Sequence, residues 1–83
     1  QLDRTAAIID VLKEDGASTA YGVSFRIPWI LNGVTMSFEE LPALDKRLAV
    51  MSTLAHLEPL WTEGKVRKIR SDGIITYEVE WSI

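Results

Sequence analysis

Apolar residues recur with a helical period near the start of the chain. Residues 3–15, "DRTAAIIDVLKED", carry apolar side chains at i, i+1, i+4 and i+5, which is one face of a 3.6-residue repeat. The four apolar positions are Ala7, Ile8, Val11 and Leu12. Asp3 is suited to cap this helix and Gly16 to end it. The pattern therefore predicts a helix that packs on the core.

The next stretch, residues 18–31, admits two interpretations. Ser18 or Thr19 can cap a second helix that runs to about Ile27, because Pro28 disfavours helical geometry in the residue before it. The alternative is a hairpin that turns at Asn32-Gly33, a dipeptide typical of two-residue turns. We expect the helix over residues 19–27, followed by an irregular turn.

Residues 37–63 contain the strongest helix signal. Ser37 precedes Glu40 by three residues, which is the spacing of a capping box. Proline is tolerated in the first turn of a helix but not in its interior. The sequence therefore predicts a short turn over 38–41 and a long helix from about Pro42 to Thr62, ended by Gly64.

The long helix is predicted to bury one stripe and expose another. Successive residues are about 100° apart around a helix axis, so Val50, Leu54, Leu57 and Trp61 fall together, flanked by Leu44 and Met51. The opposite side is small and polar, and it holds Asp45, Ala49, Ser52, Thr53 and His56, with Lys46 at its edge. We expect that side to face solvent or a partner.

The C-terminal residues indicate a β-hairpin. Two strand-like runs, "KVRKIR" and "IITYEVEW", surround Ser71-Asp72-Gly73, which is suited to a short loop. In the second run Ile75, Tyr77, Val79 and Trp81 alternate with polar residues, so one face is expected to be buried. In the first run, Val66 and Ile69 do not share a period-2 face.

Charge is distributed unevenly along the chain. Residues 1–45 carry three cations and seven anions, whereas residues 46–70 carry six cations and two anions. Residues 71–83 carry three anions and no cation, which gives the formal net charge of −3. Such asymmetry is typical of a polyanion-facing surface on an otherwise acidic protein, and a solvated charged hairpin is the simpler explanation.

Composition narrows the class of protein. Eighty-three residues are enough for one domain, which we assign to residues 1–83. There is no cysteine, so disulfides and cysteine zinc sites are excluded, and we expect an intracellular, cytoplasmic protein. His56 is the only histidine, Glu39 and Glu40 do not converge on one substrate, and the glycines form no phosphate-binding motif. We therefore expect no enzyme activity, no cofactor and no metal, and no apolar run approaches a membrane span.

The order helix, helix, helix, hairpin resembles the winged helix-turn-helix superfamily, with the cadence of MarR-like and PadR-like regulators. The resemblance is carried by residues 52–79, "STLAHLEPLWTEGKVRKIRSDGIITYEV", which look like the end of a recognition helix followed by a wing. It covers about a third of the chain and implies an α+β, mainly α, fold. That fold has a three-helix core followed by a two-stranded antiparallel wing.

The resemblance implies duplex DNA as the partner, and therefore a transcriptional regulator or accessory factor. The third helix would enter the major groove and the wing would contact phosphates, which Arg and Lys neutralise and Ser or Thr hydroxyls hydrogen-bond. The expected contacts on the helix are Lys46, Ala49, Ser52, Thr53 and His56, with Arg47 in second rank because it lies nearer the apolar stripe. Those on the wing are Lys65, Arg67, Lys68, Arg70 and Ser71.

A winged-helix module that binds a protein instead of DNA is the alternative. Net acidity and the acidic strand residues Glu78 and Glu80 favour it. DNA binding requires the six cations to share a face with Ser52 and Thr53. A homodimer is also possible, through the first helix or the last strand.

Overall fold

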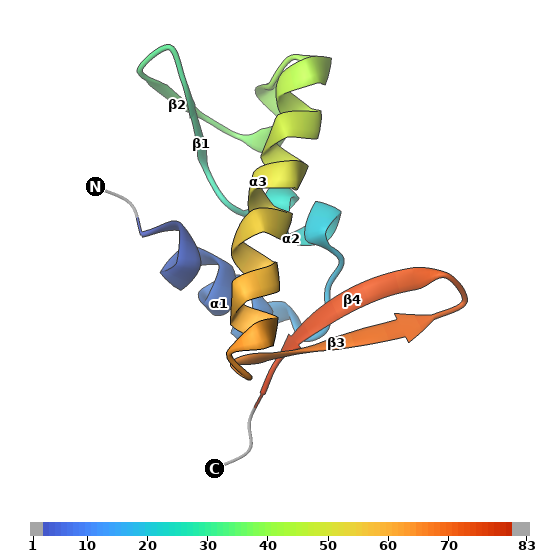
Figure 1. Cartoon of the computed structure of the whole chain (residues 1–83). Coiled ribbons are helices and arrows are strands. Elements are labelled where there is room, and N and C mark those ends of the chain that lie inside the picture. The colour runs from blue at the N-terminus through green and yellow to red at the C-terminus, as the bar shows by residue number, and fades with distance from the viewer. Residues whose placement is uncertain (1–2, 81–83) are drawn as a thin grey trace.

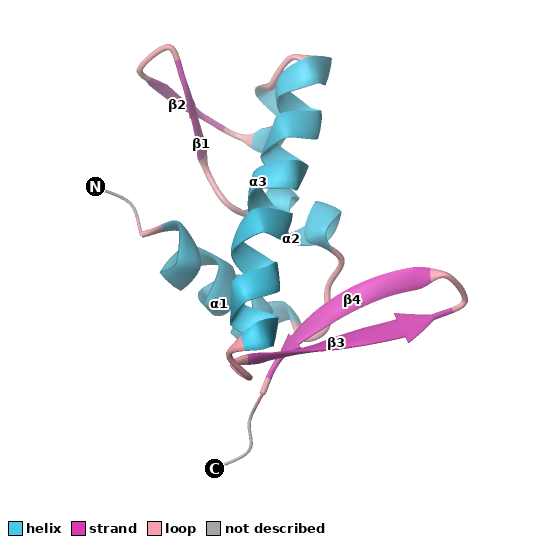
Figure 2. Ribbon diagram, in the orientation of Figure 1, coloured by secondary structure: helices cyan, strands magenta, loops and turns pink. Residues whose placement is uncertain are grey.

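The computed structural model describes residues 3–80 as an α+β fold that is mainly helical (Figures 1 and 2). These residues form three α-helices, one short 3-10 helix and two separate antiparallel hairpins. In chain order the elements are α1 (Arg4–Asp15), α2 (Ala20–Arg26), β1 (Trp29–Leu31), β2 (Val34–Met36), η1 (Phe38–Glu40), α3 (Ala43–Thr62), β3 (Val66–Ser71) and β4 (Ile74–Val79). Helix α3 runs through the middle of the molecule, and the two hairpins extend from opposite ends of it (Figure 1).

The first two helices begin where their caps predict. The Asp3 carboxylate accepts a hydrogen bond from the Ala6 N–H, and the Thr19 hydroxyl accepts one from the Gly22 N–H. Gly16 ends α1 with a φ of 79°, a left-handed value that glycine adopts without steric cost. These contacts confirm Asp3 and Thr19 as caps. The helices predicted over 3–15 and 19–27 are also confirmed, with bounds that differ by one residue at most.

The two interpretations of residues 18–36 are both realised, one after the other. Helix α2 ends at Arg26, and the chain then forms the β1–β2 hairpin with Trp29 opposite Met36. Asn32 and Gly33 have φ values of 53° and 79°, the positive angles that a two-residue hairpin turn requires. The irregular turn expected after the second helix is therefore wrong, because Asn32-Gly33 directs a regular hairpin.

Helix α3 is preceded by the predicted capping box. The Ser37 N–H donates to the Glu40 carboxylate at 2.8 Å, and η1 occupies the expected short turn. Pro42 then precedes the helix, which continues past Pro59 to Thr62. Both predicted boundaries of the long helix are confirmed.

The second hairpin has a regular register. Six residue pairs run from Val66 opposite Val79 to Ser71 opposite Ile74, so the turn is the dipeptide Asp72-Gly73. Val66 faces the core with Tyr77 and Val79, whereas Ile69 lies on the outer face. This register resolves the mismatch between Val66 and Ile69 without a bulge. Trp81 lies outside the described residues.

One hydrophobic core joins α1, α2, α3 and both hairpins. Tyr77 is its largest fully buried side chain, and β4 is further held by two backbone hydrogen bonds between Ser18 and Tyr77. Phe38 from η1 and Ile8 from α1 are also buried. The core therefore fixes the position of α3 relative to the β3–β4 hairpin.

Candidate functional site

Two of the predicted groove-facing residues of α3 are buried. Ala49 and Thr53 are 4% and 0% exposed, so they cannot contact DNA and that prediction is wrong. The Thr53 hydroxyl donates to the Ala49 carbonyl at 3.0 Å and accepts from the Ser24 hydroxyl at 2.8 Å. These small side chains let α2 approach α3 closely, and the hydrogen bonds satisfy the buried hydroxyls. The polar, small side chains of this face led to the prediction that it is exposed, whereas Ala49 and Thr53 are packed inside the protein.

The remaining predicted residues of α3 do not form one exposed face. Lys46, Ser52 and His56 are each half-buried. Lys46 and Ser52 are six residues apart, which separates them by about 120° around the helix axis. His56 is held through Nδ1, which lies 2.8 Å from the Ser52 carbonyl oxygen. The six cations consequently do not share a face with Ser52 and Thr53, as a groove contact would require.

The solvent-facing side of α3 is apolar. Leu44, Leu48 and Met51 are 66%, 51% and 63% exposed, and Ala55 continues the series with the same 4-3-4 spacing. We call Leu44, Leu48, Met51 and Ala55 the α3 ridge. Leu54 and Trp61, which the sequence assigned to the buried stripe, are exposed as well, and only Leu57 of that stripe is fully buried. The predicted orientation of α3 is therefore wrong, because α2 packs on the face that holds Ala49, Thr53, Leu57 and Leu60.

The cations of the β3–β4 hairpin are largely paired with carboxylates. Arg67 forms ion pairs with Glu78 and Glu80. Lys68 contacts Glu58 at 3.2 Å and lies 4.5 Å from the centre of the Trp61 ring. A fourth pair joins Lys65 to Glu63. Exposed ion pairs are weak, so they reduce rather than abolish the availability of these cations for phosphate.

Arg70, Ser71 and Arg47 are the predicted contacts that stay exposed without a charged partner. Within residues 3–80, Lys46, Arg47 and Arg70 form no ion pair. Lys46 and Arg47 lie in the N-terminal half of α3, and Arg70 lies near the tip of the second hairpin. Among the predicted contacts, the cations without an ion pair are thus divided between two places.

A polar cluster connects the hairpin to α3. The Tyr77 hydroxyl donates to the Glu58 carboxylate at 2.6 Å, and Lys68 contacts the same group. The Tyr77 hydrogen bond, followed by that of Lys68, lowers the pKa of Glu58 below its ordinary value. Burial, followed by the bond to Glu58, raises the pKa of Tyr77 to about 12. The cluster ties the hairpin to α3.

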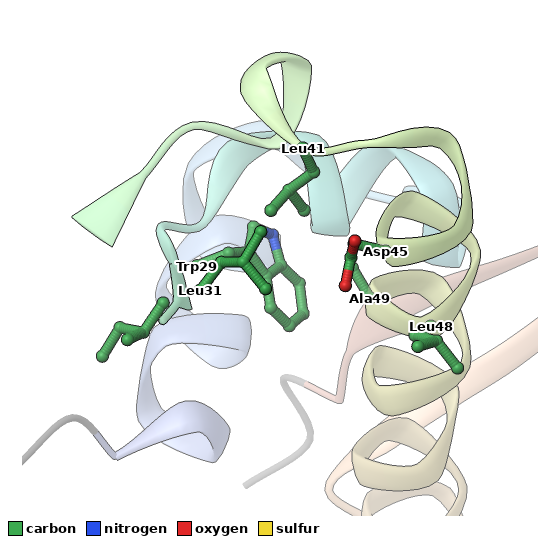
Figure 3. Close-up of a pocket in the computed structure, with 7 residues that line it drawn as sticks. Trp29, Leu31, Leu41, Asp45, Leu48 and Ala49 are labelled. Carbon is green, nitrogen blue, oxygen red and sulfur yellow. The ribbon is translucent and has the colours of Figure 1, made fainter. Parts of the chain in front are cut away.

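Two hollows flank the α3 ridge. The first, of about 160 Å³, lies between α3 and the β1 segment, with Trp29, Leu31 and Leu41 facing Asp45, Leu48 and Ala49 (Figure 3). The second, of about 380 Å³, is lined by Tyr21, Phe38, Lys46, Arg47, Val50 and Met51, and we call it the basic hollow. One flank of the ridge therefore carries a carboxylate and the other carries two cations.

The α3 ridge and the basic hollow were both missed by the sequence-based predictions. The 4-3-4 spacing of Leu44, Leu48, Met51 and Ala55 is a signal for a second apolar stripe on the same helix. The hollow has no comparable signal, because Tyr21 and Phe38 come from elements that meet α3 only in the folded chain.

Residues 3–80 contain no group of three or more potential metal ligands, and none of their helices is both long and apolar enough to span a bilayer. Comparison with protein-family models, curated proteins and solved structures found no match to this chain.

Proposed function

We propose that this chain is a protein-interaction module with a winged-helix arrangement, and that it binds its partner through the α3 ridge. The order of three helices and a C-terminal hairpin supports that arrangement, with the β1–β2 hairpin inserted before α3. The observation that carries the function is the exposure of Leu44, Leu48 and Met51 on the helix that a winged helix presents to its ligand.

The exposed side chains of the α3 ridge suit a protein surface better than a DNA groove. Leucine and methionine have no donors for phosphates or base edges, and protein–DNA interfaces are more polar and more positive than protein–protein ones. Against an apolar partner, full burial of each such side chain contributes about 1.5–3 kcal/mol. The three large residues of the ridge can therefore contribute several kcal/mol to binding a protein.

Duplex DNA is the second candidate, favoured by the unpaired cations Lys46, Arg47 and Arg70. Each neutralised phosphate contributes about −0.9 to the slope of log K against log salt, so three contacts give about −2.7. Such binding is weak at physiological salt. A transcriptional regulator or accessory role would then require further contacts, for example from a second copy of the chain.

The experiment that tests the proposal is selection of displayed random peptides on the immobilised chain. We expect binders whose affinity falls in the double variant Leu48→Ser/Met51→Ser and is retained in Ile69→Ser/Ile74→Ser. The second variant is a matched control, because Ile69 and Ile74 are exposed apolar residues on the outer face of the hairpin. Circular dichroism checks that both variants fold.

Two results would contradict the proposal. One is a selection that enriches no peptide above background, and the other is binding that is equally insensitive to both double variants. A parallel anisotropy titration with labelled random duplex DNA across a salt series tests the second candidate. A slope near about −2.7 that is lost when Lys46, Arg47 and Arg70 are changed to Ala would favour DNA.

A further inference from the structure

The basic hollow combines an apolar interior with a charged rim. Phe38 is buried, whereas Tyr21 and Met51 are well exposed around it, and the Tyr21 ring stands edge to face on Phe38 with centroids 5.3 Å apart. With a volume of about 380 Å³, the hollow has room for one large aliphatic or aromatic side chain. Met51 belongs to both the hollow and the α3 ridge, so the two surfaces are continuous.

The rim of the hollow is positive. Lys46 and Arg47 line it, and no carboxylate is present among its lining residues. Of the carboxylates nearest in sequence, Asp45 lines the hollow on the opposite flank and Glu40 accepts the Ser37 N–H. Within the described part of the chain, neither rim cation has an ion-pair partner.

We infer that the basic hollow binds an acidic segment of a partner protein, with one large apolar side chain in the hollow and neighbouring carboxylates on Lys46 and Arg47. This inference rests on the proposed function. Charge complementarity selects the acidic segment, since opposite potentials across an interface favour one class of partner over others. The apolar interior disfavours nucleic acid, whose phosphates would meet the rim and leave the hollow unfilled.

A second copy of this chain is a poorer source of that acidic segment. Much of its exposed acid is already engaged, with Glu14 and Asp15 on Arg26, Glu78 on Arg67, and Glu58 on Lys68 and Tyr77. Releasing such groups would break existing contacts before new ones form. Exposed carboxylates that form no ion pair within residues 3–80, such as Asp10, Glu39 and Asp72, stand on different elements and not together in one segment. The occupant is therefore a different protein that carries free carboxylates beside a leucine, methionine or aromatic residue.

The test uses the displayed random peptides on the whole chain and compares two charge-reversal variants. Lys46→Glu/Arg47→Glu reverses the rim, and Lys13→Glu/Arg70→Glu makes the same change in net charge at exposed positions outside the hollow. We expect selected peptides rich in Asp and Glu around one large apolar residue. Their affinity, measured by anisotropy of the labelled consensus peptide, should fall about tenfold in the rim variant and little in the control.

The outcomes separate this inference from the proposed function. Peptides that need Leu48 and Met51 but have no acidic bias, or that bind the rim variant as well as the control variant, would overturn the inference and leave the proposed function standing. Failure to select any peptide that depends on Leu48 and Met51 would overturn both. Sedimentation velocity that shows a dimer abolished only in the rim variant would identify a second copy as the occupant and also overturn the inference.

Discussion

Replacing Tyr77 with Phe isolates the bond between the hairpin and α3. Tyr77 is 2% exposed, and its hydroxyl donates to the Glu58 carboxylate at 2.6 Å. Hydrogen bonds to charged groups contribute about 1.5–3 kcal/mol. The Glu58 side chain is 43% exposed, so water can replace the lost donor, and the phenyl ring retains the apolar contacts. We therefore expect Tyr77→Phe to lower the free energy of unfolding by about 1.5 kcal/mol, at the lower end of that range.

Urea unfolding at neutral pH measures this change, and thermal unfolding checks it. For a domain of this size a loss of about 1 kcal/mol shifts Tm by about 4–8 °C, so the expected decrease is about 6–12 °C. Tyr21→Phe is the matched control, because Tyr21 is exposed and donates no hydrogen bond in the described chain. It should leave the urea midpoint unchanged.

The pH dependence provides the refuting result. The pKa of Tyr77 is raised to about 12 in the folded chain, from about 10 when unfolded. The free energy of unfolding is therefore unaffected by this group below about pH 10 and falls as pH rises from about 10 to about 12, by up to about 2.7 kcal/mol, because burial and the Glu58 carboxylate disfavour the ionised phenol. The Tyr77→Phe variant lacks this component, whereas lysine titration affects both proteins. Equal losses of stability in the two proteins over this pH range would show that Tyr77 is not the responsible group.

Three further changes test other parts of the fold. Thr53→Val should cost about 1 kcal/mol in urea unfolding, since it removes the hydrogen bond between the Ser24 and Thr53 hydroxyls but keeps the volume; an unchanged midpoint would contradict a contribution of that bond to stability. Gly73→Ala should cost about 1–2 kcal/mol, because Gly73 has a φ of 78°; equal stability would refute a left-handed turn. Glu58→Gln should flatten the loss of stability as pH falls below about 4.5, because the lowered pKa of Glu58 makes its contribution present above that pH and lost below it; a profile identical to wild type would contradict this.

The short-range features of the fold could be predicted from the sequence because each depends on a few neighbouring residues. Asp3 and the Ser37–Glu40 pair mark helix starts by their own hydrogen bonds. Asn32-Gly33 forces a hairpin wherever both residues adopt positive φ. Counting outward from a two-residue Asp72-Gly73 turn also places Arg67 opposite Glu78, as the structure has them. The loop predicted from the sequence has three residues and includes Ser71. That choice shifts the strand register by one position, so that Arg67 no longer faces Glu78.

The orientation of α3 could not be predicted in the same way. Its leucines and Met51 surround most of the helix, so no single apolar face dominates. The choice is made by α2, whose Ser24 hydroxyl meets Thr53 and whose close approach requires a residue as small as Ala49. That contact joins residues 29 positions apart, and no local pattern encodes it. The candidate site followed this error, because a rotation of the helix about its axis buries Ala49 and Thr53 of the predicted polar side and exposes Leu48 and Met51.

The two candidate ligands, DNA and a protein, differ in whether they can contact both the cations and the exposed apolar residues of α3. DNA can use Lys46 and Arg47, but in a wet groove it leaves Leu44, Leu48 and Met51 without apolar partners. The net charge of −3 adds long-range repulsion toward a polyanion, screened beyond about 8 Å at physiological salt. An acidic, apolar protein segment carries far fewer negative charges than DNA, so the net charge of the chain repels it less. Its apolar residues also cover the leucines as it binds. Because burial of those side chains contributes more than two exposed ion pairs, the apolar surface favours the proposed protein partner over DNA.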